Sequence, residues 1–257
     1  MLRPLPINAA LSASEPVYGL LNSVPHPVIV EMIATAGYDF VILDLEHLPH
    51  DEPLLKQCIQ LAMANHCAAL IRLASVDLKQ IGRVLDMGAA GIVVPQAENV
   101  DQLVEISKAM FFPPRGKRGI TGGSVTGFGK LPLADYISLA NQQLLLVPMI
   151  ESAAGVAAID EILKVDGVSM VMEGALDLAL NMGLGPEPMH ADVQLALCQL
   201  AQRCQQHGMP FCANPRSAEQ LSLWREAGVT TFLCGEDRGF LYRTLAGRLH
   251  EMHPTVA

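Results

Sequence analysis

Two carboxylates of this chain are spaced so that they can share a metal ion. Glu151 follows the apolar run Leu144–Ile150, and Asp177 follows the next apolar run after a short turn. If the runs are successive parallel strands, both side chains reach the same end of a sheet. Two carboxylates, waters and a bidentate substrate complete the octahedral oxygen set that Mg²⁺ or Mn²⁺ prefers. Such a metal polarises a 2-oxo carbonyl and stabilises the enolate. The alternative for Glu151 is a first-turn acid of the following helix.

Arg72 and His47 lie near the ends of two other apolar runs. Arg72 lies inside the apolar run Ala68–Leu73, and a buried guanidinium needs a partner. It either binds a keto oxygen and the developing enolate or forms a salt bridge with Asp44, and both roles can hold together. His47 is a candidate acid/base, tuned by Glu46 or Asp44. The alternative for His47 is an ordinary loop histidine.

Two further signals are weaker. His50 makes an H-x-x-H pair with His47, but zinc needs a third ligand that the sequence does not place. Gly174, Ala175 and Leu176 form a tight turn before Asp177, and exposed backbone N–H groups at such a turn can receive a substrate carboxylate. An ordinary strand–helix turn is the alternative.

Eight short apolar runs alternate with amphipathic stretches, as expected for buried parallel strands and their helices. The expected strands are Val17–Leu21, Asp39–Leu45, Ala68–Leu73, Gly91–Pro95, Leu144–Ile150, Ser169–Met172, Met209–Ala213 and Thr230–Cys234. The expected helices are Pro27–Thr35, Glu52–Ala64, Leu78–Met87, Val100–Met110, Ala153–Leu163, Val193–Gln206, Ala218–Glu226 and Phe240–Met252. This repeat predicts an α/β fold, a single (β/α)8 TIM barrel over residues 1–257, although an open doubly wound sheet has the same periodicity.

Composition narrows the class of protein. The 257 residues are 51% hydrophobic and 17% charged, with a net charge of -9. A large core can therefore form, and the lack of a basic stripe argues against a nucleic-acid partner. No apolar run reaches the ~20 residues that span a membrane, and no signal peptide is recognisable. Six cysteines without C-x-x-C favour a reducing, cytoplasmic setting.

Several motifs together resemble the HpcH/HpaI aldolase family. Tyr38–His47 reads YDFVILDLEH, Leu85–Pro95 reads LDMGAAGIVVP, and Phe112–Gly119 reads FPPRGKRG. Each is similar to a family signature, and they occur in the family's order. Arg72 in LIRLA and Glu151 with Asp177 match the family's strand-three arginine and its two metal ligands.

The resemblance implies a TIM barrel of the phosphoenolpyruvate/pyruvate type that binds Mg²⁺ or Mn²⁺ through Glu151 and Asp177. It implies that Arg72 binds the keto oxygen and that His47 is the acid/base, oriented by Asp44. Backbone N–H groups of Gly174, Ala175 and Leu176 would hold the 2-oxo acid's carboxylate. Family members are commonly hexamers, a homo-oligomer in which the last helix, here about residues 240–252, packs on a neighbour.

Three departures from the family pattern leave the reaction open. Met149 stands where a Gln is usual, Ala175 stands for Pro, and Glu173 adds an acid. The leading hypothesis is an aldolase acting on pyruvate or oxaloacetate. A citrate synthase-type condensation of oxaloacetate with acetyl-CoA, as in siderophore biosynthesis, is the alternative, with the basic loop Arg115–Arg118 meeting CoA phosphates. That loop can equally be solvated or contact another subunit. A barrel that only binds a metabolite is the third hypothesis.

Overall fold

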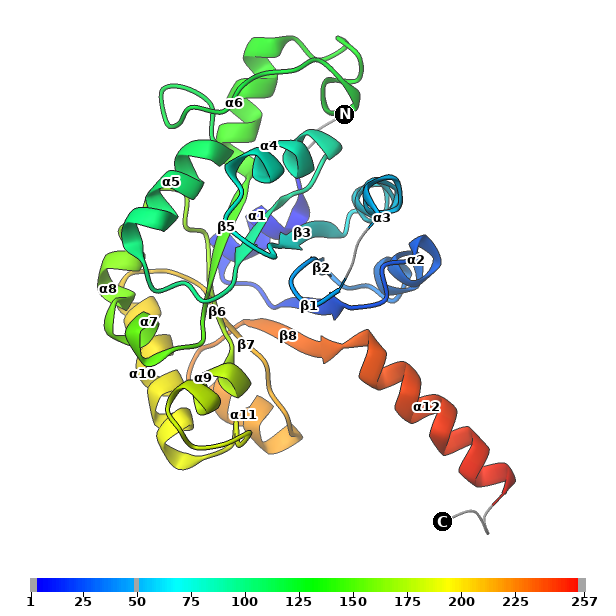
Figure 1. Ribbon diagram of the computed structural model, residues 1–257, viewed down its shortest axis with the longest axis vertical. Coiled ribbons are helices and arrows are strands. Elements are labelled where there is room, and N and C mark those ends of the chain that lie inside the picture. The colour runs from blue at the N-terminus through cyan, green and yellow to red at the C-terminus, as the bar shows by residue number, and fades with distance from the viewer. Residues whose placement is uncertain (1–3, 49–50, 254–257) are drawn as a thin grey trace.

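The computed structural model describes residues 4–48 and 51–253, and its eight strands close into one parallel barrel (Figure 1). Each strand pairs with the next in the chain, and β8 pairs back with β1. The strands are β1 Val17–Asn22, β2 Phe40–Asp44, β3 Ala68–Arg72, β4 Gly91–Val94, β5 Leu145–Ile150, β6 Val171–Glu173, β7 Phe211–Ala213 and β8 Thr231–Glu236. The predicted (β/α)8 barrel is confirmed, and all eight expected strands are present within a few residues.

Helices separate the strands as expected. They are α1 Pro6–Ala13, α2 Pro27–Thr35, α3 Glu52–Ala64, α4 Leu78–Met87, α5 Val100–Met110, α6 Leu133–Gln143, α7 Ala153–Ala157, α8 Ile159–Ile162, α9 Ala175–Asn181, α10 Ala191–Gln206, α11 Ala218–Glu226 and α12 Asp237–Met252. Five of these have the predicted bounds. The predicted Ala153–Leu163 helix is split into α7 and α8 at Ala158, while α1, α6 and α9 were not expected.

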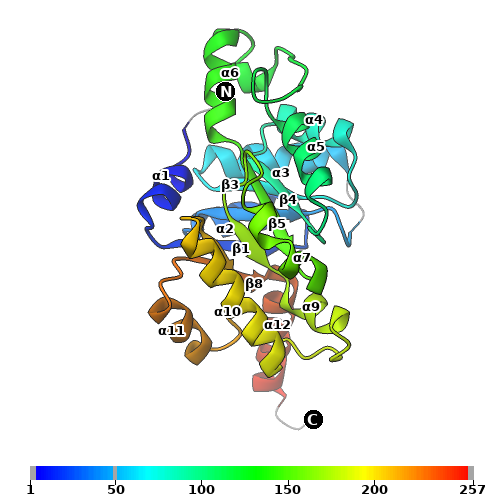
Figure 2. The same ribbon diagram turned by 90° about the vertical axis from the view of Figure 1, so that its left-hand side faces the viewer.

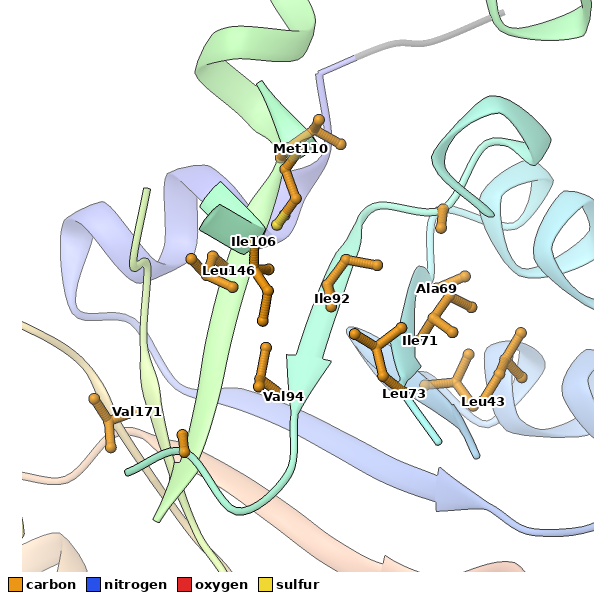
Figure 3. Close-up of a cluster of buried hydrophobic side chains, with 14 of the residues drawn as sticks. Leu43, Ala69, Ile71, Leu73, Ile92, Val94, Ile106, Met110, Leu146 and Val171 are labelled. Atoms are coloured by element: carbon orange, nitrogen blue, oxygen red, sulfur yellow. The ribbon is translucent and has the colours of Figure 1, made fainter. Parts of the chain in front are cut away.

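Alternate residues of each strand face two separate cores. One core fills the barrel interior and includes Phe40, Leu70, Val147 and Met172. Gly19 leaves the room for the Phe40 ring, since a Cβ at that position would clash with it. The other core lies between the strands and the helices, where the labelled side chains of Figure 3 gather. This alternation decides which residues at the strand ends can face the barrel mouth.

The amino-terminal helix closes the end of the barrel that lies away from the strands' carboxyl ends. Leu5, Ile7 and Leu11 of this segment are buried in the same cluster as the barrel interior. Asn8 Nδ2 donates to Gln143 Oε1 over 2.7 Å, which ties α1 to the end of α6. The carboxyl ends of the strands are thereby left as the open face.

The last helix leaves the barrel instead of covering it. α6 and α12 lie at opposite ends of the long axis of the molecule (Figure 2). α12 carries large exposed apolar side chains, namely Phe240, Leu241, Tyr242, Leu245, Leu249 and Met252. Among the described helices, none has the length and apolar character needed to cross a membrane.

Candidate active site

Strand alternation brings the predicted catalytic residues of β2, β3 and β5 to the barrel mouth. Asp44 lies beyond Ile42 on the inner face of β2, and Arg72 lies beyond Leu70 on the inner face of β3. The two residues are direct partners in the β2–β3 register. Glu151 follows Met149 on the inner face of β5. Three of the predicted residues therefore converge at the carboxyl ends of the strands.

Arg72 is held by two carboxylates. Its Nε and Nη2 each donate to an oxygen of Asp44 over 2.9 Å, and its Nη1 lies 3.3 Å from Glu46 Oε2. Burial acts to raise the pKa of Asp44, but the hydrogen bonds and charge of Arg72 outweigh burial, so this pKa lies below its ordinary value. The predicted structural pair of Arg72 with Asp44 is present, and it fixes the plane of the guanidinium.

The histidine contact differs from the expectation. His47 Nε2 lies 3.5 Å from Glu46 Oε2, whereas both oxygens of Asp44 bind Arg72. Glu46 is thus the carboxylate that contacts His47, whereas Asp44, which the resemblance implied for this role, holds Arg72. The His47 side chain is 58% exposed, so it can reach a substrate at the mouth. His50, the other half of the H-x-x-H pair, falls outside the described residues.

Glu151 is a buried carboxylate with little positive charge around it. Gln96 donates its backbone N–H to Glu151 Oε1 over 2.6 Å, and a Cβ at Gly174 would clash with Oε2. Burial, together with the charges of Glu46 and Asp177, raises the pKa of Glu151 to about 7. Gln96 adopts a left-handed backbone, φ +48°, to aim that N–H.

This donor set fits a divalent cation. The charges of Glu46 and Asp177 oppose the ionisation of Glu151, and the charge of Asp177 also opposes that of Glu46. A hard cation would remove that repulsion, and oxygen ligands are those that Mg²⁺ and Mn²⁺ prefer. In the described part of the chain no three His, Cys, Asp or Glu side chains form a ready-made metal cluster. Substrate and water oxygens would therefore complete the coordination.

The turn before Asp177 has some of its backbone donors free, whereas the Gly174 N–H donates to the Ile150 carbonyl over 3.0 Å and the Ala175 N–H donates to the Glu173 carboxylate. Leu178 is the first residue of this turn whose N–H bonds back within the helix, to the Gly174 carbonyl over 2.9 Å. The N–H groups of Ala175, Leu176 and Asp177 precede that bond and make no helical hydrogen bond. Ala175 is buried and Leu176 is 46% exposed, so the turn presents both sealed and accessible donors.

Met149 and Glu173, two of the three departures from the family pattern, lie on different faces of the barrel wall. Met149 is 4% exposed and lies in the barrel interior beside Met172, directly beneath Glu151. Glu173 follows Met172 on β6 and therefore points to the helical layer, where it pairs with Arg216 over 3.2 Å. Met149 makes the floor of the mouth apolar, whereas the extra acid does not enter the mouth.

The basic loop is committed to partners within the chain. Arg118 is buried, binds Asp86 over 2.7 Å and lies over the Phe112 ring. Arg115 pairs with Asp166 over 2.8 Å. Lys117 Nζ lies 3.5 Å from Glu105 Oε2, so all three cations that were expected to meet CoA phosphates already have acidic partners.

Sequence reasoning undervalued two residues of the site. Glu46 was considered only as a neighbour of His47, yet it also contacts Arg72. Gln96 directly follows the expected strand Gly91–Pro95 and was given no role, yet its backbone N–H orients Glu151. The signal for Glu46 was strand parity, because it lies two residues after the inward-facing Asp44. The Gln96 contact comes from the backbone and leaves no signal in residue type.

Comparison with known proteins agrees with this geometry. Residues 18–231 match the family described as HpcH/HpaI aldolase/citrate lyase. A hydroxypyruvate/pyruvate aldolase of Delftia acidovorans (strain DSM 14801 / SPH-1) is 36% identical over 197 residues, which cover 77% of this chain and 73% of the relative. A 5-keto-4-deoxy-D-glucarate aldolase of Enterobacter sp. (strain 638) is 30% identical, with 96% and 95% covered. The crystal structure of citrate synthase SbnG has a TM-score of 0.88 at 35% identity, with 96% of both chains covered.

Proposed function

The chain belongs to the HpcH/HpaI aldolase/citrate lyase family, and on that premise we propose a metal-dependent aldolase that makes or breaks a carbon–carbon bond next to a 2-oxo acid. The resemblance drawn from the motifs is confirmed, and the chain is an enzyme of the aldolase type. The observation that carries the metal proposal is the buried Glu151, whose pKa is raised to about 7 by burial and by Glu46 and Asp177. Glu151 and Asp177 are the proposed ligands of Mg²⁺ or Mn²⁺.

When bound, the cation supplies Lewis-acid polarisation of the 2-oxo group and stabilises the enolate's charge. Arg72 is fixed by Asp44 and Glu46, and its remaining N–H groups donate to the same oxygen as negative charge develops. In the turn formed by Gly174, Ala175 and Leu176, the Gly174 and Ala175 N–H groups are taken by Ile150 and Glu173, so the N–H groups of Leu176 and Asp177 bind the substrate carboxylate. Met149 packs beneath the substrate.

His47 is the proposed acid/base. Its exposed imidazole can take a proton from the hydroxyl of the substrate in cleavage and return one to the enolate carbon. Glu46 orients the ring, since its Oε2 lies 3.5 Å from His47 Nε2.

A citrate-forming reaction is the second candidate. It is favoured by the likeness to citrate synthase SbnG over nearly the whole of both chains. The apolar Met149 beside Glu151 suits a substrate different from that of aldolases with a polar group there. Oxaloacetate would then be the electrophile and acetyl-CoA the nucleophile.

We also propose that α12 packs on another copy of the chain, so that residues 1–257 form one barrel domain within a homo-oligomer, a hexamer by family resemblance. Its exposed apolar face supports this proposal, because a contiguous row of large apolar side chains is costly to leave in water. The six cysteines are free thiols in the structure, which supports a reducing compartment such as the cytoplasm.

One experiment separates the two reactions. Purified enzyme loaded with Mg²⁺ or Mn²⁺ is given 4-hydroxy-2-oxo acids and assayed for pyruvate, and in parallel is given oxaloacetate with acetyl-CoA and assayed for free thiol. Pyruvate release that EDTA abolishes and the metal restores is expected. Thiol release with citrate formed would replace the aldolase proposal with the second candidate. Neither product from either mixture would refute both.

A further inference from the structure

The buried carboxylate of Glu173 has no part in the chemistry above, yet it joins two turns of the open face. Its side chain has no exposed surface. One oxygen accepts the Asn214 backbone N–H over 2.6 Å, and the other lies 3.2 Å from Arg216 Nη1. The backbone N–H of Ala175, at the start of the turn that bears Asp177, also supports this carboxylate. Glu173 thus links the β6–α9 turn to the β7–α11 turn.

Arg216 completes the link from the opposite side. Its Nη1 also donates to the Asn214 carbonyl over 2.9 Å, and its own backbone N–H donates to Gln220 Oε1 over 2.7 Å. The Asn214 backbone is therefore gripped at its N–H by Glu173 and at its C=O by Arg216. Such a double constraint is more than a surface turn needs to close.

The Asn214 side chain, whose backbone Glu173 and Arg216 hold in place, faces the barrel mouth. Cys212 of β7 lies in the barrel interior and Ala213 in the outer core, so the next residue, Asn214, returns to the inner side. Asn214 is half-buried, and among the described residues its amide makes no hydrogen bond. The neighbouring strand, β6, leads into the turn that carries Asp177. A half-buried, unpaired amide therefore lies on the open face, at the end of the strand next to β6.

We propose that Asn214 determines the choice of the second reactant, an aldehyde with a hydroxyl group beside its carbonyl, and that Glu173 and Arg216 are positioning residues for Asn214. The amide offers one donor group and one acceptor, and a hydroxyl can satisfy either. A site that hydrogen-bonds a hydroxyl discriminates against the analogue that lacks it, because a half-buried polar group is then left unpaired.

This inference rests on the proposed aldolase reaction. In the synthetic direction, the methyl carbon of pyruvate loses a proton and bonds to the aldehyde carbon. The aldehyde oxygen takes up a proton and becomes the new hydroxyl, and the 2-oxo group is restored. Atoms and charge balance without a further reactant, and Asn214 takes no part in the proton transfers.

The test compares glycolaldehyde with acetaldehyde, which differ by one hydroxyl, as partners of pyruvate with the metal-loaded enzyme. We expect a preference for glycolaldehyde in kcat/KM of about tenfold or more. Asn214→Ala should reduce the preference to about threefold or less, mainly through the KM for glycolaldehyde. Glu161→Gln removes an exposed carboxylate of α8 and is the matched control, with an unchanged preference.

Variants of Glu173 and Arg216 test whether these two residues position Asn214. In Glu173→Gln an amide NH₂ meets the donors of Asn214 or Arg216, so the KM for glycolaldehyde should rise while kcat with acetaldehyde is kept. Adding Arg216→Gln lets two amides pair and should restore part of the preference. If Glu173→Gln does not fold, Arg216→Lys, which keeps the charge but changes the donor geometry, replaces it.

Exchange of the pyruvate methyl hydrogens in D₂O, without aldehyde, separates this inference from the function it rests on. No metal-dependent exchange by the wild type would refute the proposed function itself. Exchange in every variant, with an undiminished glycolaldehyde preference in Asn214→Ala, would overturn the inference alone. A wild-type preference for acetaldehyde would overturn it as well.

Discussion

Two arginine–carboxylate pairs lie at the open face, one on each side of the barrel wall. Arg72 and Asp44 each lie two residues after an inward-facing residue of β3 or β2 and so point inward, whereas Glu173 lies one residue after the inward-facing Met172 and so points outward. The inner pair is bidentate, with two contacts of 2.9 Å, and the outer pair has one contact of 3.2 Å. The same chemical pair therefore aims a charge at substrate in one place and holds a turn in the other. Strand parity decides which role each pair has.

The carboxylates also respond differently to their arginines. Burial acts on both, but Arg72 outweighs it and lowers the pKa of Asp44, whereas burial outweighs Arg216 and raises the pKa of Glu173. The inner carboxylate is thus firmly ionised and keeps Arg72 in one orientation. The outer carboxylate is stabilised by the charge of Arg216 and by the backbone N–H groups of Asn214 and Ala175, but burial outweighs them all.

The largest effect is expected at the barrel mouth, from loss of the proposed metal ligands. Glu151→Ala and Asp177→Ala should each abolish metal-dependent turnover and leave the fold intact, because each removes a proposed ligand that lies outside the cores, at the end of β5 or in the first turn of α9. Circular dichroism checks the fold, and turnover is measured with Mg²⁺ or Mn²⁺ and with EDTA. Full activity of either variant in EDTA would refute the metal assignment.

Loss of the inner arginine comes next. Arg72→Ala should lower kcat by about 10²–10³, since it removes a charged donor aimed at the developing enolate oxygen. Methyl hydrogen exchange of pyruvate should fall in parallel. Arg72→Lys keeps the charge but loses the bidentate contact with Asp44. Its kcat should therefore lie between that of the wild type and that of Arg72→Ala. Turnover that is unchanged in Arg72→Ala would reduce this inner pair to a structural role like that of the outer one.

Much of this comparison could be read from the sequence. Periodicity placed all eight strands, and the positions of Asp44, Arg72 and Glu151 after apolar runs placed them at one end of the barrel. Asp44 as the partner of Arg72 was also anticipated. These successes share a cause, because buried parallel strands leave few polar residues, and those few must lie at strand ends.

The rest depended on contacts that residue types do not encode. The helix α9 is only seven residues long and follows a three-residue strand, so neither gives a clear period. Glu173 seemed to lie beside the chemistry until the pairing of β6 fixed its parity. Gln96 acts through its backbone, and α1 is held by long-range packing against the barrel interior.

Loss of the outer arginine should give the opposite signature to Arg72→Ala. Arg216→Met leaves the buried Glu173 carboxylate without its cation, and breaking such a pair costs on the order of 3 kcal/mol of unfolding free energy. Pyruvate methyl hydrogen exchange should nevertheless stay near the wild-type rate at a temperature where both proteins are folded. Thermal unfolding and the exchange assay together check this. A collapse of exchange in the folded variant would place Arg216 among the residues that act on the enolate.

The smallest expected effect concerns the basic loop, a third group of paired cations. Arg115 binds Asp166 over 2.8 Å and lies over the Phe111 ring, but the Asp166 side chain is 64% exposed. An ion pair so open to water contributes about 1 kcal/mol or less. Arg115→Gln should therefore lower thermal stability slightly and leave KM values for the 2-oxo acid and for acetyl-CoA unchanged. A rise in KM confined to acetyl-CoA would show that the loop binds a phosphate-bearing substrate. Arg115 would then act on substrate, as Arg72 does, and would not be a structural cation.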